Sequence, residues 1–468
     1  MLILQHMFVP LKISQKSLSA ISPDLIQTLP AKLSGQQEIG ELLVLMSQEP
    51  TFRKLAILGV PGSGKTTLMR YLTLIYASRK QRKLIHPEAP SYIPVLMYLR
   101  DVGKDILESP KLPLVDLINT WVQRLQTIEP LTPPSGWFAK KLKENQCLIL
   151  LDGLDEIADE TERRTVSQWV DFQMQEYPDL PFILTSRPLG YKHAKLQQPV
   201  TVLEVQPFTL AQVQTFIYSW YLETEVKSQD NDDLGVRDEA KLQADDLIKH
   251  IRDSAPLVAM AVNPLLLTMI ATVHRRGSAL PGKRVELYKE ICQVLLEKRQ
   301  RAKGLADKLT ATQKQSVLQG LALELMVRKT RSFVLAEVED LLRQRLRLVV
   351  KDEASPENFL KKMREESGLL VAKEEDVYEF VHLSFQEYLA SVEIREANHE
   401  QILLEAFHDP EKLSWWSETS RLYAAQGDSS NIIQAAMECS TVESLALAFD
   451  CLEEGKSVTP SVRTDLEA

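Results

Sequence analysis

The sequence predicts an α/β fold with a parallel sheet up to residue 206 and a largely helical arrangement beyond it. Two uninterrupted apolar runs, at residues 55–58 and 147–151, are typical of strands that a parallel sheet buries on both faces. A helical pattern follows the first run at residues 67–76. From Pro207 onward, strand–helix alternation gives way to helical spacing alone. We therefore expect an α/β core followed by helical domains.

Length, composition and charge restrict the possible classes of protein. A chain of 468 residues is too long for one hydrophobic core, so we expect about two to four domains. The net charge of −9 argues against a broad surface for nucleic acid or membranes. The apolar stretch at residues 264–273 is too short to cross a bilayer. No basic residue precedes Lys12, so a signal peptide is not expected.

The cysteines favour a reducing compartment. They are scattered along the chain without the spacing of metal ligands, at Cys147, Cys292, Cys439 and Cys451. Each is interpreted as a buried thiol and not as part of a disulfide framework. The protein is therefore predicted to be soluble and cytoplasmic.

A phosphate-binding loop is the strongest motif in the sequence. Residues 59–66 match G-x-x-x-x-G-K-[ST] between a strand and a helix, which is the context the motif requires. Glycines let successive backbone N–H groups point at phosphate oxygens, and the helix N-terminus adds partial positive charge. Lys65 can then reach the β- and γ-phosphates, and the Thr66 hydroxyl can ligate Mg²⁺. The alternative, a glycine-rich turn that matches by chance, is disfavoured by the Lys-Thr pair and by both flanks.

The segments around this loop complete the predicted core. A short strand at residues 7–13 and a helix at 36–47 precede it, and a second core strand at 92–99 follows. An amphipathic helix is expected at 115–128, and a shorter one near Trp137. The residues predicted to contact the nucleotide through the loop are Gly59, Pro61, Gly62, Ser63, Gly64, Lys65, Thr66 and Thr67.

Acidic residues follow the second apolar run. Asp152 ends the run, where a P-loop enzyme needs an acid close to its Mg²⁺. Asp155 and Glu156 lie on the adjacent turn, so that one carboxylate can complete the metal site and another can polarise the attacking water. The alternative is that these acids are solvated and cap the next helix.

A third buried strand, within residues 181–188, ends in polar residues. The carboxyl ends of such strands line the ligand crevice of open α/β sheets. Thr185, Ser186 or Arg187 is therefore placed to sense the γ-phosphate. The alternative for Arg187 is an ordinary surface position.

The second half of the chain is predicted to be helical, with one small sheet. Residues 223–239 are acidic and polar and are expected to form an exposed loop, after which Asn263-Pro264 opens an apolar helix. A long helix follows at 284–300. Residues 310–397 have the order of a winged helix, with strands at 368–372 and 377–382. Acids at 365–366 and 374–376 disfavour DNA binding there, so we interpret it as a structural module.

The last part of the chain shows helical patterns at residues 422–425, 432–437 and 442–452, without a convincing repeat. His382, between a strand and a helix of the winged-helix segment, is by position an ordinary interior histidine.

Five motifs together resemble those of NACHT-domain proteins. They are Gly-Val-Pro-Gly-Ser-Gly-Lys-Thr-Thr, Leu-Leu-Asp-Gly-Leu-Asp-Glu, Leu-Thr-Ser-Arg-Pro, Asn-Pro-Leu-Leu-Leu and Phe-Val-His-Leu-Ser-Phe-Gln-Glu-Tyr. NACHT-domain proteins belong to the STAND class of signalling P-loop NTPases, which includes relatives of NOD-like receptors and bacterial antiphage proteins. The resemblance covers residues 35–395. It implies an AAA-like core, a helical domain, a winged helix and a repeat-type sensor.

This resemblance also implies domain boundaries. The expected order is an N-terminal strand and helix at 1–50, a nucleotide-binding core at 51–206, a helical domain at 207–305, a winged helix at 306–398, and a helical, HEAT-like start of a sensor at 399–468. Because the match begins within the first few dozen residues and the sensor is short, the effector and the ligand are not specified.

Residue roles are carried over on the same motifs. Asp152 is similar to the Walker B acid that supports Mg²⁺, and Asp155 and Glu156 to the catalytic acids after it. Arg187 is similar to the sensor arginine beside the γ-phosphate. Pro264 is similar to the proline that packs on adenine, and His382 to the winged-helix histidine that contacts the β-phosphate of ADP. The resemblance therefore implies ATP, ADP and Mg²⁺ as ligands.

The function expected from these observations is a nucleotide-dependent switch. ADP would hold the protein closed and monomeric, and exchange for ATP, triggered by a ligand or partner, would promote oligomerisation in defence or signalling, with slow hydrolysis as the reset. Adenine is favoured over guanine because no Asn-Lys-x-Asp motif is present. Two alternatives stay open: an AAA-type ATPase that remodels a protein or nucleic-acid substrate with multiple turnover, and a scaffold that binds nucleotide without cycling.

Overall fold

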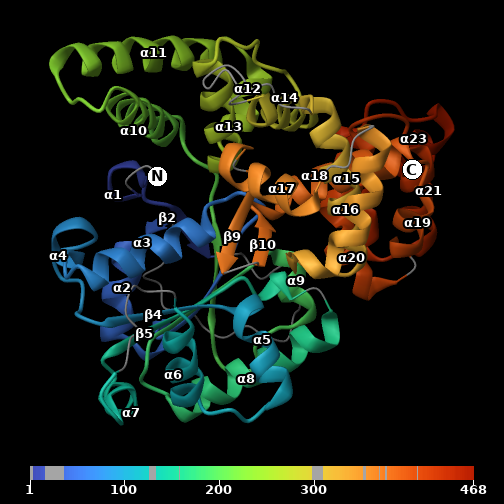
Figure 1. Ribbon diagram of the computed structural model, residues 1–468. Coiled ribbons are helices and arrows are strands. Elements are labelled where there is room, and N and C mark those ends of the chain that lie inside the picture. The colour runs from blue at the N-terminus through green and yellow to red at the C-terminus, as the bar shows by residue number, and fades with distance from the viewer. Residues whose placement is uncertain are drawn as a thin grey trace. The chain divides into compact units, whose positions relative to one another are not determined.

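The computed structural model describes residues 4–15, 36–125, 133–157, 159–297, 309–350, 355–367, 369–374, 377–407 and 409–468. They form two compact units, Met1–Ala271 and Thr272–Ala468 (Figure 1).

A mostly parallel sheet forms the centre of the first unit, as predicted. Its seven strands are arranged in the order β2-β1-β7-β3-β6-β5-β4. Strands β7, β3, β6, β5 and β4 run parallel, whereas β1 is antiparallel to both of its neighbours. The strand bounds are Lys12–Gln15 (β1), Gln36–Glu38 (β2), Lys54–Leu58 (β3), Ile93–Tyr98 (β4), Cys147–Asp152 (β5), Phe182–Ser186 (β6) and Thr201–Val205 (β7).

The strand register brings several loop residues to one edge of this sheet. Leu58 at the end of β3 lies opposite Ser186 at the end of β6. Asp152 at the end of β5 lies opposite Tyr98 at the end of β4. Because the strands are parallel, the residues that follow them all emerge at the same edge. The phosphate loop and the acids after β5 therefore share this edge.

Helices precede, connect and follow the strands of the first unit. Their bounds are Leu4–Met7 (α1), Ile39–Gln48 (α2), Lys65–Ala77 (α3), Gln81–Leu84 (α4), Leu99–Glu108 (α5), Leu114–Arg124 (α6), Trp137–Lys143 (α7), Glu160–Glu176 (α8), Pro188–His193 (α9), Leu210–Gln229 (α10), Leu234–Arg252 (α11), Ala255–Ala261 (α12) and Pro264–Arg275 (α13), with short turns of 3-10 helix at Pro50–Phe52 (η2) and Leu154–Glu156 (η3). Trp169 of α8 is 1% exposed and anchors the core on one face of the sheet.

Several expectations for this unit are corrected. The strand expected at 7–13 begins only at Lys12, after helix α1. Strand β7 has no counterpart in the sequence-based prediction, and the helix expected at 36–47 begins only at Ile39, after strand β2. Residues 223–239 do not form a loop: α10 continues to Gln229, and α11 begins at Leu234 after its N-cap Asp233, so that the two helices lie against each other (Figure 1). Glu, Lys and Gln are good helix formers, so polarity alone does not indicate a loop.

A winged helix occupies the first part of the second unit, as predicted. Strand β8 (Ser332–Val334) lies between helices α15 (Ala311–Val327) and α16 (Leu335–Val349). It joins β9 (Leu370–Glu374) and β10 (Val377–Phe380) in an antiparallel sheet of order β8-β10-β9, and α18 (Leu383–Glu396) follows the sheet and packs on α15. Strand β8 is additional to the two predicted strands. Position 368 and the side chains at 365–366 and 374–376, which bear on the DNA-binding question, lie outside the described residues.

After the winged helix the second unit is helical, which confirms the predicted helical C-terminal region. Their bounds are Arg284–Glu297 (α14), Ala311–Val327 (α15), Ser332–Val334 (β8), Leu335–Val349 (α16), Pro356–Lys362 (α17), Met363–Ser367 (η4), Leu370–Glu374 (β9), Val377–Phe380 (β10), Leu383–Glu396 (α18), Gln401–Phe407 (α19), Pro410–Ala424 (α20), Ser430–Cys439 (α21), Val442–Glu454 (α22) and Pro460–Glu467 (α23).

The cysteines and the apolar helices complete the comparison with the sequence. All four thiols are free, and three are buried; Cys439 is only partly buried, because it lies at the end of α21. Among the helices that the structure describes, none is both long and apolar enough to cross a membrane.

Candidate nucleotide-binding site

The phosphate loop connects β3 to α3 at the carboxyl edge of the first sheet. All five residues of β3 are buried, and the Gly59 N–H donates to the Ser186 carbonyl of β6 at 3.2 Å, which fixes the start of the loop. Gly62 and Gly64 have φ of 75° and 91°, a region that side chains disfavour. Gly64 is also the N-cap of α3, so the loop feeds directly into the helix N-terminus.

Lys65 lies across its own loop. Its Nζ donates to the Gly59 carbonyl at 2.6 Å and to the Val60 carbonyl at 3.2 Å. Burial lowers the pKa of Lys65 to about 8, and the nearby Asp155 carboxylate opposes this shift. The ammonium is therefore held among carbonyls and acids at the point where the motif requires a cation for phosphates.

The other predicted loop residues differ in exposure. The Ser63 side chain is buried, and its Oγ has no hydrogen-bond partner among the described residues. Pro61 and Thr66 are partly buried, and Thr67 is exposed on the first turn of α3.

Asp152 ends β5 and is only 1% exposed. Its Oδ1 accepts a hydrogen bond of 2.5 Å from Thr185 Oγ1, which in turn accepts from the Gly153 N–H at 2.9 Å. The second carboxylate oxygen, Oδ2, is buried and has no hydrogen-bond partner within the part of the chain that the structure describes. Burial and the neighbouring Glu156 raise the pKa of Asp152, while the hydroxyls of Thr185 and Thr66 act in the opposite direction.

Asp155 and Arg187 form a pair at the mouth of the site. The Arg187 N–H donates to Asp155 Oδ1 at 2.9 Å, and Arg187 Nε lies 3.2 Å from Oδ2. The turn after β5 approaches α9 closely, because a Cβ at Gly190 would lie 2.6 Å from the Asp155 Cβ. The predicted sensor arginine and one predicted catalytic acid are therefore held together by the backbone as well as by their charges.

Glu156 is paired with an arginine that the sequence analysis missed. Arg100 is the second residue of α5, which follows β4. It forms an ion pair with Glu156, and its guanidinium carbon lies 4.9 Å from the centre of the Tyr98 ring. Both partners are largely buried, at 11% and 13% exposure. The position of Arg100 after a core strand could have identified it, because polar residues after β5 and β6 were predicted to line the site for the same reason.

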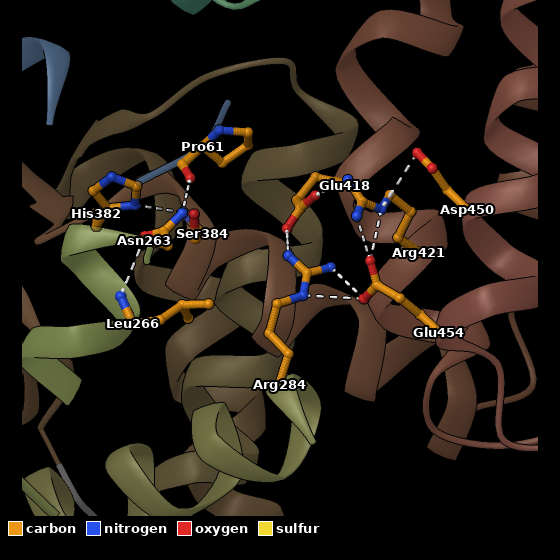
Figure 2. A network of polar contacts seen from close by, with 10 residues as sticks. All are labelled: Pro61, Asn263, Leu266, Arg284, His382, Ser384, Glu418, Arg421, Asp450 and Glu454. Atoms are coloured by element: carbon orange, nitrogen blue, oxygen red, sulfur yellow. Dashed lines mark hydrogen bonds and ion pairs between the residues drawn. The ribbon is translucent and has the colours of Figure 1, made fainter. Parts of the chain in front are cut away.

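Pro264 lies beside the loop, as the first residue of α13. A Cβ placed on Gly64 would lie 3.9 Å from Pro264 Cγ and 3.6 Å from a Leu11 methyl, so apolar groups flank the loop at this point. The preceding Asn263 donates from Nδ2 to the Pro61 carbonyl at 2.9 Å (Figure 2). The structure therefore brings Pro264 to the predicted site through a contact between the loop and the helix start.

His382 belongs to the second unit, where it is the N-cap of α18. Its Nδ1 accepts a hydrogen bond of 3.1 Å from the Ser384 N–H (Figure 2). The predicted contact of His382 with nucleotide stays a prediction.

Comparison with protein-family models identifies two domains. The model described as the NACHT domain matches residues 53–224, and the model described as the winged helix-turn-helix domain C-terminal to NACHT matches residues 284–394. Between them they cover more than half of the chain. No curated protein matches the sequence.

Solved structures with similar chains include three archaeal proteins. A STAND protein with a tetratricopeptide-repeat sensor from Pyrococcus horikoshii is 13% identical; the match covers 95% of this chain and 52% of that one, with a TM-score of 0.36. Cdc6p from Pyrobaculum aerophilum is 12% identical, with 83% and 99% covered and a TM-score of 0.28. ORC1 from Aeropyrum pernix, solved with DNA, is 14% identical, with 83% and 99% covered and a TM-score of 0.27.

TM-scores this low carry no structural argument, so the classification depends on the two family models. The phosphate loop and the acids after β5 lie inside the first matched span, and the small sheet with α18 lies inside the second. The chain belongs to the NACHT-domain P-loop NTPases.

Proposed function

We propose that this chain is a switch that binds ATP and ADP, changes conformation and oligomeric state with the nucleotide, and hydrolyses ATP slowly. Lys65 and the loop residues hold the phosphates, Pro264 packs on adenine, and Arg187 senses the γ-phosphate. His382 contacts ADP in the closed form. The output is signalling or defence, started by an activating ligand or protein partner.

The observation that supports slow hydrolysis is the pairing of both candidate catalytic acids with arginines. Glu156 is ion-paired with Arg100, and Asp155 with Arg187. A carboxylate held by a guanidinium is a weaker base for an attacking water than a free one, because proton uptake would break the pair. Such a site favours retention of nucleotide over rapid turnover, which is what a switch requires.

Asp152 at the end of β5 and Thr66 in the first turn of α3 fit a magnesium ion. Mg²⁺ prefers oxygen ligands, and the Asp152 carboxylate and Thr66 hydroxyl belong to that class. Asp152 Oδ2 is buried without a hydrogen-bond partner among the described atoms, and burial raises the pKa of this carboxyl, so a cation would relieve both costs. When bound, Mg²⁺ neutralises phosphate charge. Asp152 and Thr66 are the residues that would hold it.

The domain boundaries proposed for this switch are those expected from the sequence. The nucleotide-binding core spans 51–206, the helical domain 207–305, the winged helix 306–398 and a sensor-like region 399–468. A switch requires that nucleotide contacts two arrangements of these domains differently, since equal contacts shift no equilibrium.

The test is to identify the nucleotide released from the denatured protein and to compare molecular mass with and without excess MgATP. We expect bound ADP, a monomer before addition, and a larger species after it. Steady turnover stimulated many-fold by a protein or nucleic-acid substrate would replace this proposal by a remodelling ATPase. Unchanged nucleotide state and mass in Glu156→Gln would instead indicate a scaffold.

A further inference from the structure

The phosphate loop is hydrogen-bonded to the start of α13 at two successive carbonyls. Asn263 Nδ2 donates to the Pro61 carbonyl at 2.9 Å (Figure 2), and the Leu265 N–H donates to the Gly62 carbonyl at 3.2 Å. Residues about two hundred positions apart in the sequence are therefore joined on the side of the loop that faces α13.

Peptide planarity gives these bonds a consequence for phosphate binding. In a trans peptide the carbonyl and the following N–H point in opposite directions. Fixing the Pro61 carbonyl toward Asn263 therefore directs the Gly62 N–H away from α13. Phosphate loops bind anions through successive N–H groups of this kind. The Asn263 amide thus orients the Gly62 N–H, although Asn263 does not itself contact the phosphate.

The same side chain begins the helix. Asn263 Oδ1 accepts from the Leu265 N–H at 3.0 Å and from the Leu266 N–H at 3.3 Å, which is an N-cap arrangement. An amide carries both a donor and an acceptor, so it can hold the loop and cap α13 at once. Aspartate and serine retain capping ability, but a carboxylate has no donor and a serine is shorter.

Gly62 permits this close approach. A Cβ at Gly62 would lie 2.7 Å from Asn263 Oδ1 and 2.8 Å from Leu265 Cβ, and its φ of 75° also disfavours side chains. The loop and the helix start are therefore fitted to each other, and neither can move far without the other.

We propose that Asn263 is a positioning residue that couples the phosphate loop to α13, so that filling the loop with nucleotide stabilises the first turn of the helix. This inference depends on the proposed function only in requiring that nucleotide binds the loop. By linkage, the free energy by which bound nucleotide stabilises the first turn of α13 equals the free energy that the formed turn adds to nucleotide binding. Asn263 contacts the loop backbone and is not a catalytic residue.

The experiment compares the wild type with Asn263→Ser and Asn263→Asp. Affinity for an ADP analogue with a fluorescent N-methylanthraniloyl group is measured first, with Lys65→Ala as the non-binding reference. We expect about fivefold to tenfold weaker binding for both variants, as for the loss of one buried hydrogen bond. Agreement between the uncharged serine and the charged aspartate excludes simple repulsion of phosphate.

The decisive measurement is amide hydrogen exchange across 265–267, with and without MgADP. In the wild type, nucleotide should slow exchange in this turn at least severalfold, and in both variants this change should largely disappear while the loop itself is still protected. Thr209→Ala, which removes the N-cap of α10, is the matched control and should keep the wild-type response.

Three outcomes separate the possibilities. A wild type that binds no nucleotide would overturn the proposed function. A wild type that binds, together with variants of unchanged affinity and unchanged exchange response, would overturn only the coupling role. Variants that lose thermal stability without nucleotide but keep affinity and response would make Asn263 a helix cap alone, and would overturn it as well.

Discussion

Arginines and acids form a cluster in each compact unit, and the two clusters differ in how their charges are satisfied. In the second unit, Glu418 and Glu454 each contact both Arg284 and Arg421 (Figure 2). Arg284 Nε lies 3.0 Å from Glu454, and Asp450 adds a contact of 3.7 Å to Arg421. We call these five residues the ionic cluster; it joins α14, α20 and α22.

In the nucleotide site the two acids after β5 pair with different arginines. Glu156 is paired with Arg100 and Asp155 with Arg187, while Asp152 has hydroxyl contacts and one buried oxygen without a hydrogen bond among the described residues. Burial lowers the pKa of Arg284, but Glu418 and Glu454 more than reverse this, so it is raised. In the site, burial dominates and the pKa of Lys65 falls.

The difference separates a structural cluster from a site prepared for a ligand. Each guanidinium of the ionic cluster contacts at least two carboxylates, so ion pairs within the unit join α14, α20 and α22. In the nucleotide site, the partly buried Lys65 contacts backbone carbonyls, and one oxygen of the buried Asp152 has no hydrogen bond among the described residues. In the proposed function, phosphate and a cation would compensate these two groups. The predictions below test this division, from the largest expected effect to the smallest.

The largest effect is expected from Lys65→Ala. The variant should bind ATP and ADP about a thousandfold more weakly, or about 4 kcal/mol, because the cation expected to face the phosphates is lost. The nucleotide that copurifies with the protein, measured by chromatography after denaturation, should disappear. The unfolding of the second unit should not change. Retention of the parental amount of nucleotide would contradict the site.

Arg284→Ala should act on stability and leave nucleotide affinity unchanged. Removing one guanidinium leaves Glu418, which is 3% exposed, short of a partner, and should destabilise the second unit by about 3 kcal/mol. Hydrogen exchange of α20 and α22 peptides in rising urea measures this. Arg463→Ala, which breaks an exposed pair with Glu467, is the control and should cost less than about 0.5 kcal/mol.

Arg100→Gln tests whether the pairing of Glu156 restrains hydrolysis. Freeing the carboxylate should raise the single-turnover rate about tenfold, equivalent to about 1.4 kcal/mol of barrier. The increase should be absent in the double variant with Glu156→Gln, which lacks the base. A slower Arg100→Gln enzyme would show instead that Arg100 orients the acid for catalysis.

The smallest effect is the pH dependence of nucleotide affinity. The pKa of Lys65 is lowered to about 8, so the side chain is charged below that pH and increasingly neutral above it. Phosphate requires the charged form, and affinity should fall about fivefold from pH 8 to pH 9. Titration with ADP at constant ionic strength measures this. Lys65→Arg, which stays charged, should show no such fall whatever its absolute affinity.

Local patterns in the sequence were enough for the main strands and for the order of the domains. Residues 55–58 and 147–151 lie in buried strands, as expected for short apolar runs that end at a glycine or an acid. The winged helix was predicted from the order of its segments, because helical patterns are followed by two strand patterns and a further helical pattern. The loop predicted at 223–239 was wrong because polar helices and polar loops have similar compositions. Only the packing between α10 and α11 shows that these residues are largely helical.

The sequence by itself determined that a phosphate loop, acids after a core strand and a polar strand end are present. Only the tertiary structure decided their partners: Arg100 for Glu156, Thr185 for Asp152, and Asn263 for Pro61. These contacts join residues from 33 to 202 positions apart. Strand register and helix placement set such distances through the packing of the whole unit, and no local pattern of residues encodes them.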